Sequence, residues 1–89
     1  MRLKYHFVVR QIAGEPVAVA VGQDNMKFHG MIKMNHSAAF VFRQLSRGDV
    51  REEELVQAVM TEYALSREEA HRTVAAFLAQ LWEEALLVE

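Results

Sequence analysis

The sequence predicts an α+β fold in which the strands come first and the helices follow. Residues 5–34 contain runs of β-branched and aromatic residues separated by turn-forming residues. From residue 35 onward, apolar residues recur at helical spacing, and capping residues mark where helices begin and end. We therefore expect a three-stranded antiparallel sheet followed by a three-helix, winged-helix-like bundle. No linker or repeat interrupts residues 1–89, which are expected to form one domain.

The first two strands are expected to form a hairpin. Residues 5–12 favour a strand, and the turn residues 13–16 (Ala-Gly-Glu-Pro) separate them from the alternating run Val17–Val21. Because side chains alternate along a strand, the three valines of this run share one face and its two alanines share the other. We expect the valine face to lie in the core and the alanine face to admit a close neighbour.

A third strand is predicted over residues 28–34, after a turn cluster at residues 22–25 (Gly-Gln-Asp-Asn). Within this strand, Ile32 and Met34 share one face. Met31 and Lys33 point to the opposite face. A strand at the edge of a sheet has unpaired N–H and C=O groups, so an extended peptide can pair with it.

Three helices are predicted after the strands. Asn35 or Ser37 can cap the first helix, and Gly48 is placed to end it. The second runs from about residue 51 to 63 and has acidic residues in its first turn, where the helix dipole favours them. The segment Ser66-x-x-Glu69 is a capping box that opens the third helix. The residues expected to face inward are Ala38, Val41, Phe42 and Leu45 in the first helix, Leu55, Val56, Val59, Met60 and Tyr63 in the second, and Val74, Phe77, Leu78, Leu81 and Trp82 in the third.

The net charge of -2 hides a difference between the two halves of the chain. Residues 1–50 carry seven Lys or Arg and three Asp or Glu, which gives +4. Residues 51–89 carry three arginines and nine glutamates, which gives -6. The half that contains the strands is therefore basic, and the half that contains the last two helices is acidic.

The composition excludes several classes of site. The chain has no cysteine, which excludes disulfides, a thiol nucleophile and a thiolate metal site and fits a reducing cytoplasm. No apolar stretch is long enough to span a bilayer, and His6 and Arg10 interrupt any signal-like run near the start. We therefore expect a cytoplasmic protein with no contact to a membrane.

Several segments together follow the pattern of a known family. They are Met34-Asn35, the helix residues Ala39-Phe40-Val41-Phe42-Arg43-Gln44-Leu45, Gly48, Glu53-Glu54-Leu55-Val56, Tyr63, and Val74-x-x-Phe77-Leu78-x-x-Leu81. This pattern resembles the PqqD-type proteins, which are recognition domains for ribosomally made, post-translationally modified peptides (RiPPs). The resemblance covers nearly the whole chain, and its motifs are mostly core and turn positions.

The resemblance implies a non-catalytic peptide chaperone without a cofactor. In this family the leader segment of a precursor peptide adds as an extra strand beside the third strand, in a groove against the third helix. The domain then presents the precursor to a modifying enzyme, commonly a radical S-adenosylmethionine (SAM) protein. Carried onto this chain, the peptide-binding strand is Met31, Ile32, Lys33 and Met34, and the groove wall is His71, Ala75, Leu78 and Trp82. The sequence does not decide between this flank of the third helix and the flank with Thr73, Phe77 and Gln80.

Three of these side chains are expected to take part in peptide recognition. Lys33 can pair with an acidic leader residue, although an exposed pair contributes only about 0–1 kcal/mol. Met31 and Met34 can adapt to varied apolar anchors because their side chains are flexible. The chain also departs from the family pattern at Arg51, where a capping Ser or Thr is common, so Asp49 is expected to cap the second helix. Further departures are His36-Ser37 after the capping Asn, Thr73 in place of Asp, and Ala85 in place of Gly.

Catalytic and metal sites find little support in the sequence. The four histidines, His6, His29, His36 and His71, lack the spacing of zinc ligands. No nucleophile elbow, phosphate-binding loop or pair of catalytic carboxylates is present. We therefore expect neither a metal site nor an enzyme.

Two other functions remain as alternatives. A winged-helix protein can bind DNA through a helix, but the third helix sets Arg67 and Arg72 against four glutamates, and phosphates would repel that surface. The other alternative is an interaction module in which the unpaired strand edge pairs with a second copy to form a homodimer.

Overall fold

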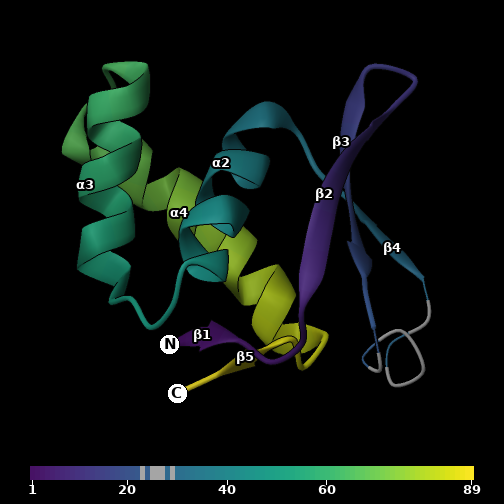
Figure 1. Cartoon of the computed structure of the whole chain (residues 1–89). Coiled ribbons are helices and arrows are strands. Elements are labelled where there is room, and N and C mark those ends of the chain that lie inside the picture. Colours follow the sequence, from purple (N-terminus) through teal and green to yellow (C-terminus); the bar gives the residue numbers. More distant parts are fainter. Residues whose placement is uncertain (23, 25–27, 29) are drawn as a thin grey trace.

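The computed structural model describes residues 1–22, 24, 28 and 30–89. Its elements are β1 (Arg2–Leu3), β2 (Phe7–Ile12), β3 (Glu15–Ala20), β4 (Met31–Lys33), α2 (His36–Ser46), α3 (Glu52–Tyr63), α4 (Arg67–Glu83) and β5 (Leu87–Val88) (Figure 1). The predicted order of three sheet strands followed by three helices is confirmed. Of the predicted turn at 22–25, Gln23 and Asn25 lie outside the described residues, as does His29 of the predicted third strand.

The main sheet is antiparallel and has the strand order β2-β3-β4. Ala18 of the central strand lies opposite Val9 on β2 and opposite Ile32 on β4. β4 is shorter than the predicted strand, since Phe28 and Met34 both lie outside its bounds. The Phe28 ring stacks on Tyr5, at 6.2 Å between centroids. β4 is last in the strand order, so it is an edge strand with only one side against β3.

A second, two-stranded sheet joins the two ends of the chain and was not predicted. β1 pairs with β5 in antiparallel register, with Leu3 opposite Leu87. Figure 1 shows both ends side by side below the helices. Each strand has only two residues, which is too short to leave a periodic pattern in the sequence.

The core lies between the sheet and the helices, and the alanine face of β3 points into it. Ala18 is fully buried in the main hydrophobic cluster, whereas Val19 is only half-buried. The prediction that the valine face forms the core is therefore wrong, although Val17 is itself buried outside this cluster. The reason is that α2 packs against β3, and small side chains on the inner face allow the helix to come close.

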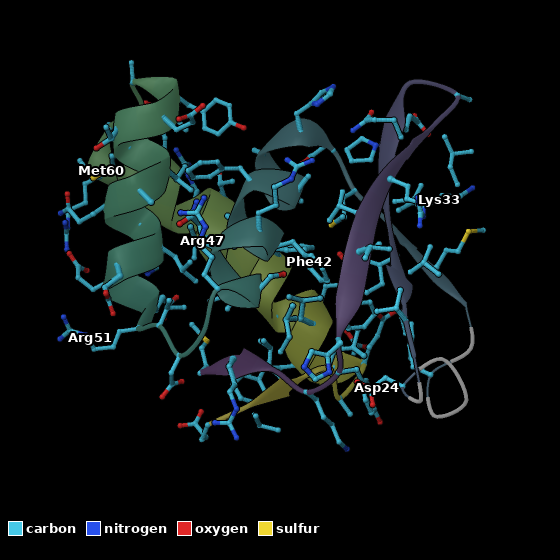
Figure 2. The ribbon with its side chains drawn as sticks, in the orientation of Figure 1. Asp24, Lys33, Phe42, Arg47, Arg51 and Met60 are labelled. Carbon is cyan, nitrogen blue, oxygen red and sulfur yellow. The ribbon has the colours of Figure 1, made fainter. Side chains whose placement is uncertain are left out.

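α2 connects the sheet to the rest of the bundle. Its N-cap is Asn35, whose side-chain oxygen accepts a hydrogen bond from the Ala38 N–H at 2.8 Å. Phe42 is fully buried between α2 and the sheet (Figure 2). Its ring contacts those of Phe7, at 5.3 Å between centroids, and Phe77, at 6.4 Å. This one side chain therefore links β2 to α4.

α3 begins differently from the prediction. Arg51 is the N-cap, and the Glu54 carboxylate accepts hydrogen bonds from its backbone N–H at 3.0 Å and its Nε–H at 3.3 Å. Asp49 does not cap this helix, which corrects the prediction. Its carboxylate instead pairs with the Met1 ammonium at 2.8 Å, and this hydrogen bond lowers the pKa of Asp49.

α4 begins as predicted, with Ser66 and Glu69 forming the capping box. Its buried side chains are Ala70, Val74, Phe77, Leu78 and Leu81. Trp82, predicted to face inward, is 40% exposed, so that prediction is wrong. Trp82 lies at the border of the apolar stripe, toward the two chain ends rather than toward the sheet. None of the helices in the described part of the chain has the length and apolar content needed to cross a bilayer.

Candidate functional site

The outer edge of β4 is open to solvent within the described part of the chain. The Met34 N–H donates to the Pro16 carbonyl on β3 at 3.1 Å. In an antiparallel pair, residues that exchange backbone bonds alternate with residues that do not. Ile32 therefore directs its peptide groups toward β3, whereas those of Met31 and Lys33 point to the open edge.

The side chains of β4 alternate as predicted. Ile32 and Met34 are buried and face the core. Met31 is 57% exposed and Lys33 is exposed, on the opposite face. Figure 2 shows Lys33 on the far side of the sheet from α3. The Lys33 ammonium makes no ion pair with any described residue.

A groove of about 380 Å³ lies beside β4 and is walled by α4. Its lining comes from three segments of the chain. The residues are Lys33 and Met34 at the strand, Asn35, Ser37 and Ala38 at the start of α2, and Thr73, Ala76, Phe77 and Gln80 on α4. Met34, Ala38, Ala76 and Phe77 contribute apolar side chains to this lining, and its other residues include hydroxyl and amide groups. The groove thus runs alongside a strand edge that has free hydrogen-bonding groups.

The structure does not bring the predicted site residues together. Lys33 and Met34 line the groove, and Met31 and Ile32 belong to its strand. Ala75, Leu78 and Trp82 lie on another flank of α4 and line a separate pocket. His71 is exposed and lines neither of these cavities. Thr73, Phe77 and Gln80, the flank that the sequence left open, face the groove together with Ala76.

The two flanks of α4 point in nearly opposite directions for a simple reason. Ala75, Leu78 and Trp82 follow Thr73, Ala76 and Gln80 by two positions each. Two positions correspond to roughly 200° around a helix with 3.6 residues per turn. Both flanks carry small and apolar residues at helical spacing, so the sequence pattern does not distinguish between them. Ala38 and Ala76 were missed because alanines carry no chemical signature.

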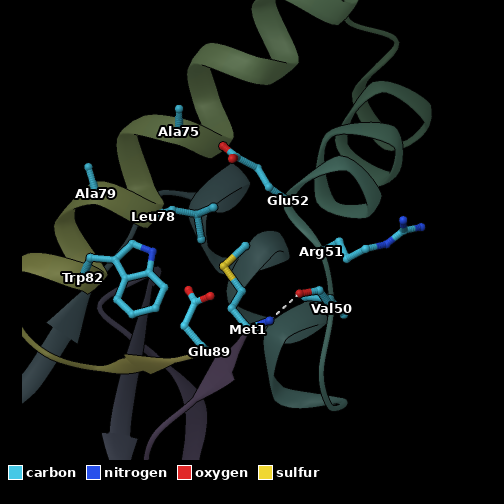
Figure 3. A pocket seen from close by; sticks show the side chains of 9 residues that line it. All are labelled: Met1, Val50, Arg51, Glu52, Ala75, Leu78, Ala79, Trp82 and Glu89. Carbon is cyan, nitrogen blue, oxygen red and sulfur yellow. Dashed lines mark hydrogen bonds between the residues drawn. The ribbon is translucent and has the colours of Figure 1, made fainter.

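The second pocket has a volume of about 510 Å³ and lies where α3, α4 and the two ends of the chain meet (Figure 3). It is lined by Met1, Val50, Arg51, Glu52, Ala75, Leu78, Ala79, Trp82 and Glu89. The Met1 ammonium donates to the Val50 carbonyl at 2.8 Å, which fixes the first residue against the α2–α3 connection. The two cavities are therefore separate and share α4 as a wall.

No metal centre is formed by the residues that the structure describes. No group of three or more His, Asp or Glu side chains among them converges on one point. His6 lies against the Asp24 carboxylate, with its ring Nδ1 at 2.9 Å.

Comparison with known proteins identifies the family of the chain. The model of the family described as coenzyme PQQ synthesis protein D (PqqD) matches residues 9–87. The chain belongs to the PqqD family. The match includes β4, the groove and all of α4, but not β1, so the PqqD-type resemblance seen in the sequence is confirmed.

Two solved structures share the fold of this PqqD-family chain. One is described as TbiB1 in complex with the TbiA(beta) leader peptide; its TM-score is 0.71 at 24% identity, over 98% of this chain and 94% of that chain. The other is described as lasso peptide synthetase B1 complexed with the leader peptide, with a TM-score of 0.68 at 24% identity, over 99% of this chain and 96% of that chain. No curated protein matches the PqqD-family chain.

Proposed function

We propose that this PqqD-family chain binds the leader segment of a ribosomally made precursor peptide as an added strand along β4. The observation that carries this proposal is the coincidence of an open strand edge with a groove against α4. In this arrangement the peptide pairs with the outward N–H and C=O groups of Met31 and Lys33. Main-chain pairing supplies affinity, and pockets for alternate side chains supply specificity.

Side chains on one face of the added strand enter the groove. That face continues the core face of the sheet, so these side chains lie over Ala76 and Phe77, with Thr73 and Gln80 at the sides. The small Ala38 and Ala76 leave room for a large apolar leader residue. We therefore assign the wall of the site to the Thr73 flank of α4, in place of His71, Ala75, Leu78 and Trp82.

Side chains on the other face of the added strand lie beside Met31 and Lys33. A leader residue directly opposite Lys33 projects on the same side as the ammonium group, within reach of it. Since Lys33 has no partner among the described residues, an acidic leader residue at this position is favoured. Its contribution is modest, about 0–1 kcal/mol, because the pair is exposed.

The two solved structures of similar fold support this proposal, because both are described as complexes with a leader peptide. We further propose that the chain is non-catalytic and presents the bound precursor to a modifying enzyme. The resemblance to PqqD-type proteins favours a radical SAM protein as that enzyme.

The test uses calorimetric titration with synthetic leader segments of precursor peptides encoded beside the gene, and a scrambled peptide. The decisive variant is Lys33→Pro, which removes an outward N–H without removing a bond to β3. A leader carbonyl left unpaired costs about 1–3 kcal/mol, so affinity should fall roughly 5- to 150-fold. Lys33→Ala keeps the N–H and should weaken binding at most about fivefold.

Gln11→Pro is the matched control. Val21 N–H donates to the His6 carbonyl, and by alternation the peptide groups of Gln11 point away from β3, on the opposite edge of the same sheet. This variant should bind the leader with unchanged affinity. Equal binding by Lys33→Pro and the unmodified chain, or equal loss in both proline variants, would contradict strand addition at β4.

A further inference from the structure

The pocket on the other flank of α4 has features that the proposed function does not use. Its floor is formed by the side chains of Met1, Leu78 and Trp82 (Figure 3). Leu78 is 4% exposed, but Trp82 is 40% exposed. No hydrogen bond or ring contact to another described residue involves the Trp82 indole. Part of the Trp82 indole is thus left exposed in the pocket.

Other large exposed apolar side chains have a structural account. Tyr63 donates its hydroxyl to the His36 carbonyl at 3.2 Å and packs its ring on Phe40. Met31 lies on the β4 edge, and Ile12 is at the end of β2, next to the hairpin turn. Trp82 has no such account, and a bare tryptophan beside a hollow is typical of a contact site for a partner.

The charges around this pocket are acidic once internal pairs are considered. The Met1 ammonium is paired with Asp49 at 2.8 Å. The Arg51 guanidinium is paired with Glu54 at 3.3 Å, and Figure 3 shows it directed away from the pocket. Glu52 and Glu89 make no ion pair with any described residue.

Figure 3 shows how these two free carboxylates lie. The Glu52 side chain points across toward α4, and the Glu89 carboxylate lies beside Met1 and Trp82. Two carboxylates therefore flank an apolar floor that includes an exposed indole. A ligand that fits has an aliphatic body and a positive head, because a cation is attracted both to the carboxylates and to the face of a tryptophan.

We propose that this Trp82 pocket binds a segment of the modifying enzyme that carries Lys or Arg next to an aliphatic residue. The aliphatic side chain contacts Leu78 and Met1, and the cationic side chain lies along the Trp82 indole with its head between Glu52 and Glu89. The charge of -6 on residues 51–89 attracts such a segment. Only the identity of the partner as the modifying enzyme rests on the proposed function.

The Trp82 pocket does not overlap the leader groove. The leader groove and the Trp82 pocket lie on nearly opposite flanks of α4, so both can be occupied at once. A leader bound along β4 and an enzyme bound at Trp82 are then held on either side of one helix. The chain would thereby bring substrate and enzyme together without taking part in the reaction.

The test uses fluorescence, because Trp82 is the single tryptophan of the chain. The intact protein is titrated with two probes, acetyl-Gly-Lys-Leu-Arg-Gly-amide and its charge-inverted counterpart acetyl-Gly-Glu-Leu-Asp-Gly-amide. The cationic probe should change the Trp82 emission in a saturable way, and its affinity should be lower at high salt. The anionic probe should not change the emission. The double variant Glu52→Gln with Glu89→Gln should bind the cationic probe with about fivefold lower affinity.

The matched control is Glu62→Gln with Glu68→Gln, which removes the same charge from exposed positions away from the pocket. An equal loss of affinity in this control, an equal response to both probes, or no response would overturn the proposal. An emission change that follows protein concentration alone, with a doubled mass, would assign the pocket to a second copy and also overturn it.

The outcome is independent of the leader test. If leader binding is lost in every variant while the cationic probe still binds at Trp82, the proposed function is refuted and the proposal for the Trp82 pocket stands. Leader binding sensitive to Lys33→Pro, with no response at Trp82, would remove only the pocket.

Discussion

Two alanines at the ends of helices adopt a backbone conformation that favours glycine, and replacing them should stabilise the protein. Ala64 follows α3 at φ 52°, and Ala85 follows α4 at φ 58°. Both are exposed, so a glycine loses no buried contact. In Ala85 the backbone N–H donates to the Trp82 carbonyl at 3.0 Å, and this bond is retained. Ala64→Gly and Ala85→Gly therefore change mainly the backbone energy.

The magnitude follows from two opposing terms. The left-handed conformation costs alanine about 1–2 kcal/mol, which glycine does not incur. Glycine gives the unfolded chain more conformational entropy than alanine does. This stabilises the unfolded state by about 0.4–1 kcal/mol and opposes the benefit. The net stabilisation is about 0.8 kcal/mol for each substitution, or roughly 3–6 °C in Tm for a domain of this size.

The assay is urea unfolding followed by circular dichroism, with Ala79→Gly as control. Ala79 is exposed within α4, where glycine costs about 1 kcal/mol relative to alanine. The same chemical change should therefore raise the unfolding free energy at residues 64 and 85 and lower it at residue 79. A decrease at all three positions would refute the reasoning from the backbone angles.

Two further predictions concern the groove and the acidic surface. Ala76→Phe should fill the groove and weaken leader binding about tenfold in calorimetry, whereas Ala79→Phe on the other flank should leave it unchanged; equal effects would contradict the assignment of the flanks. The hydrogen bond from Arg67 holds the pKa of Glu53 below its usual 4.5, so Arg67→Gln should raise that pKa toward 4.5 in an NMR titration. Because a depressed pKa stabilises the fold above the unfolded value, the advantage of the unmodified chain over Arg67→Gln should shrink as pH falls below 4.5, and an unchanged difference would refute this.

The departures from the family pattern have different structural outcomes. Ala85, where the family often has glycine, adopts a left-handed conformation, so glycine would suit the same backbone. Arg51 is the N-cap of α3 without a capping oxygen, and Glu54 satisfies its N–H instead. Thr73, where the family often has Asp, lines the groove and donates its hydroxyl to the Glu69 carbonyl at 3.1 Å.

α4 is a wall shared by the two cavities. Its Thr73 flank faces the strand edge, and its Ala75 flank faces the pocket at the chain ends. The sequence placed Lys33 and Trp82 in one site, but the structure assigns them to different cavities. Substitutions on one flank can therefore be tested without disturbing the other.

The sequence by itself determined the element order, the alternation of β4 and the helix starts at Asn35 and Ser66, because these depend on local periodicity and capping. Tertiary structure alone decided which face of β3 is buried, which flank of α4 faces β4, and that Arg2 and Leu3 pair with the end of the chain. The physical reason is that an amphipathic element specifies an apolar face, but its neighbour is set by how all the elements pack. Where both faces carry small or apolar residues, as in β3 and α4, only that packing distinguishes them.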